Sequence, residues 1–206
     1  MIKAVIFDLD GVLLDNTSVI VEVFQEDARR CGVKVPDRKE AIRALGLPWM
    51  DAVEKLLGKD EKYKKIHREV WAEYEDKMKL MPDIEKVLNE LKQEKAIVTS
   101  KAKDTAKRQL KNFLHYFKFI VAMEDTKEHK PNPEPLLKAC NQLNVEPNET
   151  VYVGDYIRDF EMARNAGTDF VGILSGALSK EEFEKVGAKR LITSLSELTD
   201  IIKNKF

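Results

Sequence analysis

Short apolar runs, rich in β-branched residues, alternate with amphipathic segments along most of this chain, and that alternation constrains the fold more than any other feature. Six runs are strand candidates: residues 4–7, 96–98, 119–121, 151–153, 170–173 and 191–192. Helical periodicity lies between most of them, at residues 84–93, 103–113, 134–143 and 160–165. Near-continuous apolar runs are typical of parallel strands that are covered on both faces. The sequence therefore predicts an α/β fold with a doubly wound parallel sheet.

The stretch between the first two strand candidates breaks this alternation. Its apolar residues recur at helical spacing, as at Val19 and Val23, and it contains no convincing strand. We therefore predict a helical subdomain, residues 16–79, inserted into a core domain of residues 1–15 and 80–206.

Composition and charge exclude several classes of protein. Of the 206 residues, 43% are hydrophobic, which is enough for a substantial core, and the net charge of -1 provides no field to attract nucleic acid or an anionic membrane. No apolar run approaches the roughly 20 residues of a membrane helix, and Asp8 interrupts the first run too early for a signal peptide. Cys31 and Cys140 lack metal-site spacing, which indicates two reduced, buried thiols. We expect a cytoplasmic protein without nucleic-acid or membrane partners, either a monomer or a small homo-oligomer.

Polar side chains follow four of the predicted strands, at the end where open parallel sheets bind ligands. In chain order they are Asp8 and Asp10, then Thr99, Ser100 and Lys101, then Lys130, then Asp155 and Asp159. Any one of them could be an ordinary capping or solvated residue, but several carboxylates at one sheet edge repel each other unless a cation lies among them. All-oxygen ligands without a His or Cys cluster favour Mg²⁺.

Phosphoryl transfer is the chemistry that suits such a site. A carboxylate can attack phosphorus to form an aspartyl-phosphate, and a second carboxylate can protonate the leaving group and then activate water. A lysine and Mg²⁺ would neutralise the charge, while hydroxyl and backbone N–H groups would hold the phosphate oxygens.

These residues resemble the four ordered motifs of the haloacid dehalogenase-like (HAD) phosphohydrolases. The motifs stand here as Phe7-Asp8-Leu9-Asp10-Gly11, Ile97-Val98-Thr99-Ser100-Lys101, Lys130-Pro131-Asn132-Pro133, and Val153-Gly154-Asp155 with Asp159. Their order and spacing extend the resemblance over essentially the whole chain. It implies a Rossmann-like core with a C1-type cap, closest to the phosphoglycolate phosphatase-like branch.

The resemblance also implies roles for the residues of the first three motifs. Asp8 would be the nucleophile and a metal ligand, and Asp10 would be the general acid/base and a ligand through its backbone carbonyl. Thr99 and Ser100 would bind the phosphoryl group, and Lys130 would stabilise its charge.

The remaining roles fall to the fourth motif and the cap. Asp155 would coordinate Mg²⁺, and Asp159 would be a further ligand or would support the ligands. The cap loop Gly46-Leu47-Pro48-Trp49 resembles the loop that reaches toward substrate, so Trp49 is a candidate for substrate binding.

Several reactions occur in this family, and individual residues favour one of them. Asp10 disfavours dehalogenation, and the absence of histidine at residues 19–21 disfavours a sugar-phosphate mutase of the β-phosphoglucomutase type. A cap lysine such as Lys55 could serve a phosphonatase, although it is more simply a surface residue. His67, His115 and His129 are interpreted as surface residues.

The sequence therefore predicts an Mg²⁺-dependent phosphatase that acts on a small phosphate monoester, such as phosphoglycolate or a sugar phosphate, through Asp8. The mutase and a non-catalytic module that binds phosphorylated metabolites remain as alternatives.

Overall fold

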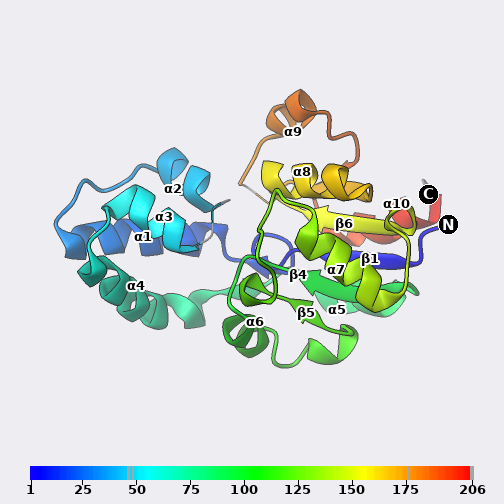
Figure 1. Cartoon of the computed structure of the whole chain (residues 1–206), viewed down its shortest axis with the longest axis horizontal. Helices are drawn as coiled ribbons and strands as arrows, with labels where there is room; N and C mark the ends of the chain where they lie inside the picture. Colours follow the sequence, from blue (N-terminus) through cyan, green and yellow to red (C-terminus); the bar gives the residue numbers. More distant parts are fainter. Residues whose placement is uncertain (46, 48, 176, 205–206) are drawn as a thin grey trace. The chain divides into compact units, whose positions relative to one another are not determined.

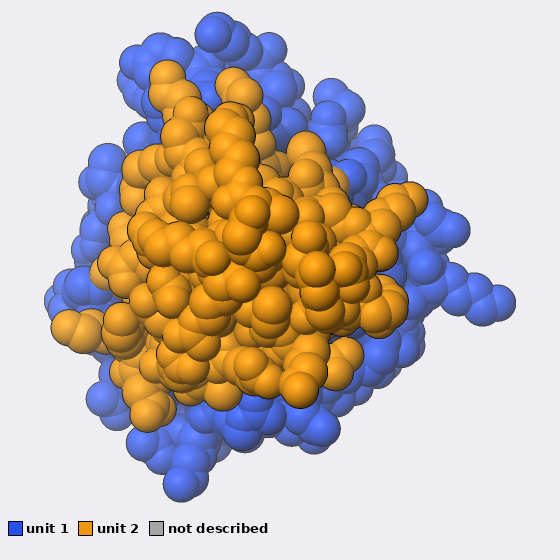
Figure 2. Space-filling view, turned by 90° about the vertical axis from the view of Figure 1, so that its left-hand side faces the viewer, with its two compact units in different colours: residues 1–13, 80–206 blue, residues 14–79 orange. Residues whose placement is uncertain are grey.

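The computed structural model describes residues 1–45, 47, 49–175 and 177–204, and the chain divides into two compact units. Unit 1 comprises Met1–Leu13 and Leu80–Phe206, and unit 2 comprises Leu14–Lys79 (Figures 1 and 2). Among the helices of the described residues, none has both the length and the apolar character needed to cross a membrane.

A six-stranded parallel sheet forms the centre of unit 1 and confirms the predicted fold class. Its strands lie in the order β5-β4-β1-β6-β7-β8, and each neighbouring pair is parallel. The strands are β1 (Ala4–Phe7), β4 (Glu94–Val98), β5 (Ile120–Val121), β6 (Thr150–Gly154), β7 (Asp169–Ile173) and β8 (Leu191–Ile192). The central strand β1 pairs with β4 and β6, so that Phe7 lies opposite Ile97 on one side and Val153 on the other.

Helices connect the strands of unit 1 and cover the sheet (Figure 1). They are α5 (Ile84–Glu90), α6 (Lys103–Gln109), α7 (Glu134–Leu143), α8 (Ile157–Ala166), α9 (Lys180–Val186) and α10 (Leu198–Asn204). Short 3₁₀ turns occur at η2 (Leu114–Tyr116), η3 (Met123–Asp125), η4 (Pro147–Glu149) and η5 (Leu195–Glu197). The helix predicted for residues 84–93 ends at Glu90, because Leu91 turns into extended backbone and is buried in the core.

The core of unit 1 forms where α7 and α8 cover one face of the sheet. Ile6, Ala96 and Tyr152 point to that face, and they pack against Leu136 of α7 and Met162 of α8. All five side chains are fully buried. This packing holds the carboxyl ends of β1, β4 and β6 at one edge, where the polar residues follow.

Unit 2 is helical and has a core of its own. Its helices are α1 (Thr17–Cys31), α2 (Arg38–Leu45), α3 (Trp49–Leu57) and α4 (Glu61–Tyr74), followed by the 3₁₀ turn η1 (Glu75–Lys77). The short strands β2 (Leu14–Asp15) and β3 (Lys79–Leu80) pair with each other where the chain passes between the units. Gly32 ends α1 in the left-handed conformation that favours glycine, and the Asp60 carboxylate caps α4 by accepting from the N–H of Lys62.

The interpretations of three single residues are wrong or only partly right. His67 is not a surface residue: it is 5% exposed because α4 packs on α1 and places its ring beside Asp27. His115 is exposed as expected, whereas His129 is half-buried. Both cysteines are free thiols, and Cys140 is buried while Cys31 is only partly so.

Candidate active site

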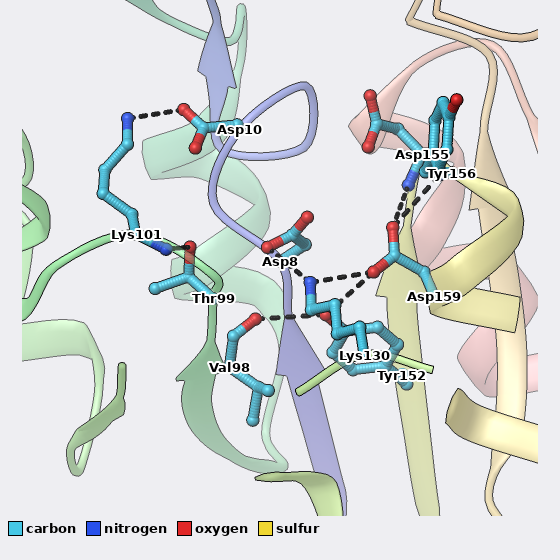
Figure 3. A network of polar contacts seen from close by, with 10 residues as sticks. All are labelled: Asp8, Asp10, Val98, Thr99, Lys101, Lys130, Tyr152, Asp155, Tyr156 and Asp159. Atoms are coloured by element: carbon cyan, nitrogen blue, oxygen red, sulfur yellow. Dashed lines mark hydrogen bonds and ion pairs between the residues drawn. The ribbon is translucent and has the colours of Figure 1, made fainter. Parts of the chain in front are cut away.

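The polar residues predicted at the strand ends gather at the carboxyl edge of the sheet in unit 1 (Figure 3). Asp8 follows β1, Thr99 follows β4 and Asp155 follows β6. Asp159 lies in the first turn of α8, and Lys130 lies in the loop before α7. These elements bring side chains from four parts of the sequence to one place.

Three carboxylates form a close, buried cluster at this edge. Asp8, Asp155 and Asp159 each place one oxygen so that the three oxygens lie within 4.8 Å of one another. The residues are only 9%, 8% and 1% exposed. The Ser175 hydroxyl donates a hydrogen bond of 3.2 Å to Asp155 Oδ2. Such an arrangement of buried anions can bind a metal ion, since oxygen ligands in this number suit a divalent cation.

The pKa values in the cluster show that three negative charges are unfavourable there when no metal ion is bound. Burial raises the pKa of Asp8 to about 7, even though the nearby Lys130 ammonium opposes the shift. Burial likewise raises the pKa of Asp155 well above its ordinary value, and the charges of Asp159 and Asp8 add to the effect. A cation held among these oxygens would oppose both shifts, because it stabilises the ionised carboxylates.

Lys130 connects two of the carboxylates. Its Nζ lies 2.9 Å from Asp8 Oδ1 and 2.8 Å from Asp159 Oδ1, and the side chain is almost fully buried. Burial lowers the pKa of Lys130, but the charges of Asp159 and Asp8 outweigh it and hold the pKa above its ordinary value. Lys130 is therefore a fixed positive charge beside Asp8.

Asp159 has hydrogen-bond partners at both of its oxygens. Oδ1 accepts from Lys130 and lies 3.4 Å from the Tyr152 hydroxyl, which is itself 3.1 Å from the carbonyl oxygen of Val98. Oδ2 accepts from the backbone N–H groups of Asp155, at 3.2 Å, and Tyr156, at 3.0 Å. Asp159 thus orders both Lys130 and the turn that carries Asp155.

Gly11 allows the chain after β1 to pass directly beside the cluster. Its φ of +73° lies in the left-handed region, and a Cβ at this position would lie 1.9 Å from Asp155 Oδ2. Any side chain at residue 11 would therefore displace the Asp155 carboxylate.

A second polar group flanks Asp8 on the side away from Asp155 and Asp159 (Figure 3). Lys101 Nζ lies 2.6 Å from Asp10 Oδ1 and 2.8 Å from Gln109 Oε1. Thr99 is buried, and its hydroxyl oxygen accepts a hydrogen bond of 3.1 Å from the Lys101 N–H. The half-buried Ser100 lies between them in the chain.

Sequence reasoning placed Lys101 at this edge without giving it a role, and it missed the contributions of Tyr152 and Ser175. Tyr152 is a polar tip within an otherwise aliphatic strand, so it offered a signal in the sequence. Ser175 offered none, because only the fold places it beside Asp155.

The candidates of the helical subdomain lie in unit 2, apart in sequence from these groups. Trp49 begins α3 and stacks on His67 with 4.7 Å between the ring centroids. Gly46 and Pro48 of the predicted substrate loop lie outside the described residues. Lys55 is exposed on α3 and lacks the burial that activates a lysine as a nucleophile.

Known proteins resemble this chain over nearly its full length. It is 36% identical to a protein named PpaX from Caldanaerobacter subterraneus subsp. tengcongensis, over 98% of this chain and 95% of that one. It is 32% identical to pyrophosphatase PpaX of Halalkalibacterium halodurans, over 98% and 97% of the two chains. A solved structure from Bacteroides fragilis, named as a haloacid dehalogenase-like hydrolase, matches with a TM-score of 0.87 at 28% identity, over 96% of this chain and 100% of that chain.

The family model for haloacid dehalogenase-like hydrolases matches residues 5–173, a span that contains Asp8, Thr99, Lys130, Asp155 and Asp159. The named relatives and the hydrolase fold together indicate a hydrolase of the phosphatase type. The chain therefore belongs to the haloacid dehalogenase-like hydrolase family.

Proposed function

We propose that this protein is an Mg²⁺-dependent phosphatase that hydrolyses a small phosphorylated compound through an aspartyl-phosphate on Asp8. The observation that carries the proposal is the buried contact between Asp8 and Lys130 beside the carboxylates of Asp155 and Asp159. A phosphate has three oxygens that need positive partners, and this edge supplies an ammonium, a hydroxyl and a site for a cation.

Mg²⁺ fits the donor set, since the cluster is made of oxygens and a cation would oppose the burial that raises the pKa values of Asp8 and Asp155. The carboxylates of Asp8 and Asp155 and the backbone carbonyl of Asp10 would hold it. Asp159, whose oxygens already have partners, supports Lys130 and the Asp155 turn. When bound, Mg²⁺ supplies charge neutralisation for the phosphoryl oxygens.

In the first step, a carboxylate oxygen of Asp8 attacks phosphorus, and the bond from phosphorus to the leaving oxygen breaks. Asp10 gives its proton to that oxygen, so the leaving group departs neutralised. The Thr99 hydroxyl and the Ser100 N–H donate to the phosphoryl oxygens, and Lys130 stabilises their charge.

In the second step, water hydrolyses the aspartyl-phosphate. The Asp10 carboxylate takes a proton from the water, whose oxygen attacks phosphorus while the bond to Asp8 breaks. Phosphate leaves, and Asp8 and Asp10 return to their starting states.

We infer that the helical subdomain predicted at residues 16–79, which lies within unit 2, is a C1-type cap. It excludes water from the reaction and contributes Trp49 to substrate binding. Closure of a helical unit over a polar site strengthens the electrostatic interactions inside it. Specificity would then depend on side chains of unit 2.

The PpaX relatives favour inorganic pyrophosphate as a substrate to test beside phosphoglycolate and sugar phosphates. In pyrophosphate the leaving group is itself a phosphate, so the same two steps apply with Asp8 as the nucleophile. A sugar-phosphate mutase is less favoured, because residues 19–21 are Val, Ile and Val where a histidine would govern the second transfer.

The test is phosphate release from a panel of pyrophosphate, phosphoglycolate, several sugar phosphates and one phosphonate, with Mg²⁺ and with EDTA. We expect metal-dependent release that Asp8→Asn abolishes and that Asp104→Asn, an exposed control on α6, leaves unchanged. Release by Asp8→Asn at the wild-type rate would overturn the role of Asp8. Isomerised sugar phosphate without net phosphate would favour the mutase, and Mg²⁺-dependent binding of a phosphate mimic without turnover would favour a binding module.

A further inference from the structure

Two ionisable side chains lie in the otherwise apolar core of unit 2 and have no part in the proposed chemistry. Asp27 on α1 is 0% exposed, and His67 on α4 is 5% exposed. His67 Nδ1 lies 2.6 Å from Asp27 Oδ2. The surrounding core is aliphatic and aromatic, and it includes Ile20, Val21, Phe24, Ala28, Val53 and Leu57. A pair of apolar residues could fill this space without the cost of desolvating a carboxylate.

The Asp27 carboxylate depends on His67 for its pairing. Burial raises the pKa of Asp27, and the hydrogen bond and charge of His67 oppose the rise, followed by Arg30, while Glu26 adds to it. Arg30 is itself bound by Glu26 and Glu73. Among the described side chains, Asp27 Oδ1 has no hydrogen-bond partner. The hydrogen bond to Asp27 Oδ2 therefore orients the Nδ1 edge of the imidazole.

Aromatic rings surround the fixed imidazole. The Trp49 ring is closest, with 4.7 Å between centroids and 22° between the ring planes. Phe24 lies at 6.1 Å and 25°, and Trp71 lies at 5.8 Å and 41°. His67 thus presents one face to Trp49 in nearly parallel stacking, a geometry that constrains the indole.

We propose that Asp27 and His67 are positioning residues that fix the Trp49 indole for substrate binding. Asp27 orients the imidazole, and the imidazole orients the indole at the residue where α3 begins. Trp49 remains half-buried, so part of its surface is available to a ligand. The part of this inference that concerns substrate binding rests on the proposed function, in which Trp49 contacts the substrate.

The chain has only two tryptophans, and this allows a direct test: Trp49 stacks on His67, and Trp71 is tilted against it. In a Trp71→Phe background, Trp49 is the sole indole, so its emission maximum, acrylamide quenching and near-UV circular dichroism report on it alone. We expect Asp27→Val to shift the Trp49 emission to the red and to increase its quenching. Val21→Ala, which removes buried volume from the same helix and leaves both members of the pair in place, is the matched control and should change neither.

Steady-state kinetics on the best substrate of the phosphatase panel test the role of Trp49 in substrate binding. We expect Asp27→Val to raise KM by about tenfold while kcat changes by less than roughly threefold, because a binding contact is lost and the chemistry is not. Trp49→Ala should have the same signature. A wild-type KM in Trp49→Ala would overturn the role in substrate binding.

The double variant Asp27→Val/His67→Phe separates positioning from simple packing. It fills the core with apolar groups and should keep wild-type stability, yet KM should stay raised because the ring is no longer oriented by a hydrogen bond. Rescue of both stability and KM would overturn the proposal, as would unchanged Trp49 spectra in a folded Asp27→Val protein. If the wild type releases no phosphate, the proposed function fails, and the Trp49 spectra still decide whether the pair positions the indole.

Discussion

Lys130 lies between two carboxylates that belong to different elements, with Nζ 2.9 Å from Asp8 Oδ1 and 2.8 Å from Asp159 Oδ1. The ammonium links the end of β1 to the first turn of α8, across the edge at which the proposed reaction takes place.

Replacing Lys130 by methionine should reduce both activity and stability. The phosphoryl charge would lose a fixed partner, which we expect to lower kcat by about 10²–10³-fold. Asp8 and Asp159 would remain buried without a counter-charge, which should cost about 3–5 kcal/mol in urea unfolding. Lys3→Met, which breaks the exposed pair with Glu149, should change neither quantity measurably.

The metal-free protein should lose stability as the pH rises toward neutrality. The folded-state pKa of Asp8 is raised from 3.8 to about 7, so the folded protein binds an extra proton between these values. This contribution to stability is fully present below about pH 4 and is lost as the pH rises through about 7. The loss lowers the free energy of unfolding by on the order of 4 kcal/mol.

Urea unfolding in EDTA across this pH range measures the effect. Asp8→Asn should make the free energy of unfolding depend less on pH. At pH 7 without metal, this variant should be more stable than the wild type. Added Mg²⁺ should restore stability to the wild type at neutral pH and much less to the variant. A wild-type stability in EDTA that stays constant from pH 4 to pH 7 would contradict the prediction.

Gly11→Ala should impair metal binding, since the added Cβ would lie 1.9 Å from Asp155 Oδ2. We expect the Mg²⁺ concentration for half-maximal activity to rise by more than roughly tenfold. Gly32→Ala is the matched control, because Gly32 also has positive φ, at +67°, but its Cβ would meet no atom within 4 Å. It should cost only about 1–2 kcal/mol of stability and leave the Mg²⁺ dependence unchanged.

Asp155→Asn and Asp159→Asn should differ in their response to Mg²⁺. If Asp155 is a ligand and Asp159 orders Lys130, Asp155→Asn should weaken Mg²⁺ binding more strongly, while Asp159→Asn should mainly lower kcat. Mg²⁺ titration of activity, supported by calorimetric Mg²⁺ binding, distinguishes the two. Equal losses of Mg²⁺ affinity would show that Asp159 also coordinates the ion.

Local patterns in the sequence determined the sheet and the composition of its functional edge. The runs at 4–7, 96–98, 151–153, 170–173 and 191–192 lie in strands, because a doubly covered parallel strand must be apolar along its length. The run at 119–121 does so except for Phe119, which precedes β5. Asp8, Thr99 and Asp155 could be placed at one edge from the sequence, since each directly follows such a strand and parallel strands end together.

Only the tertiary structure decided which side chains touch. His67 and Asp27 are 40 residues apart, and nothing in either helix predicts that packing of α4 on α1 buries them as a pair. The contacts of Asp159 Oδ1 depend likewise on Tyr152 and Lys130, which come from other elements. Periodicity and strand ends are local properties of a chain, whereas such contacts follow from how helices and strands pack, and they are therefore set by the whole fold.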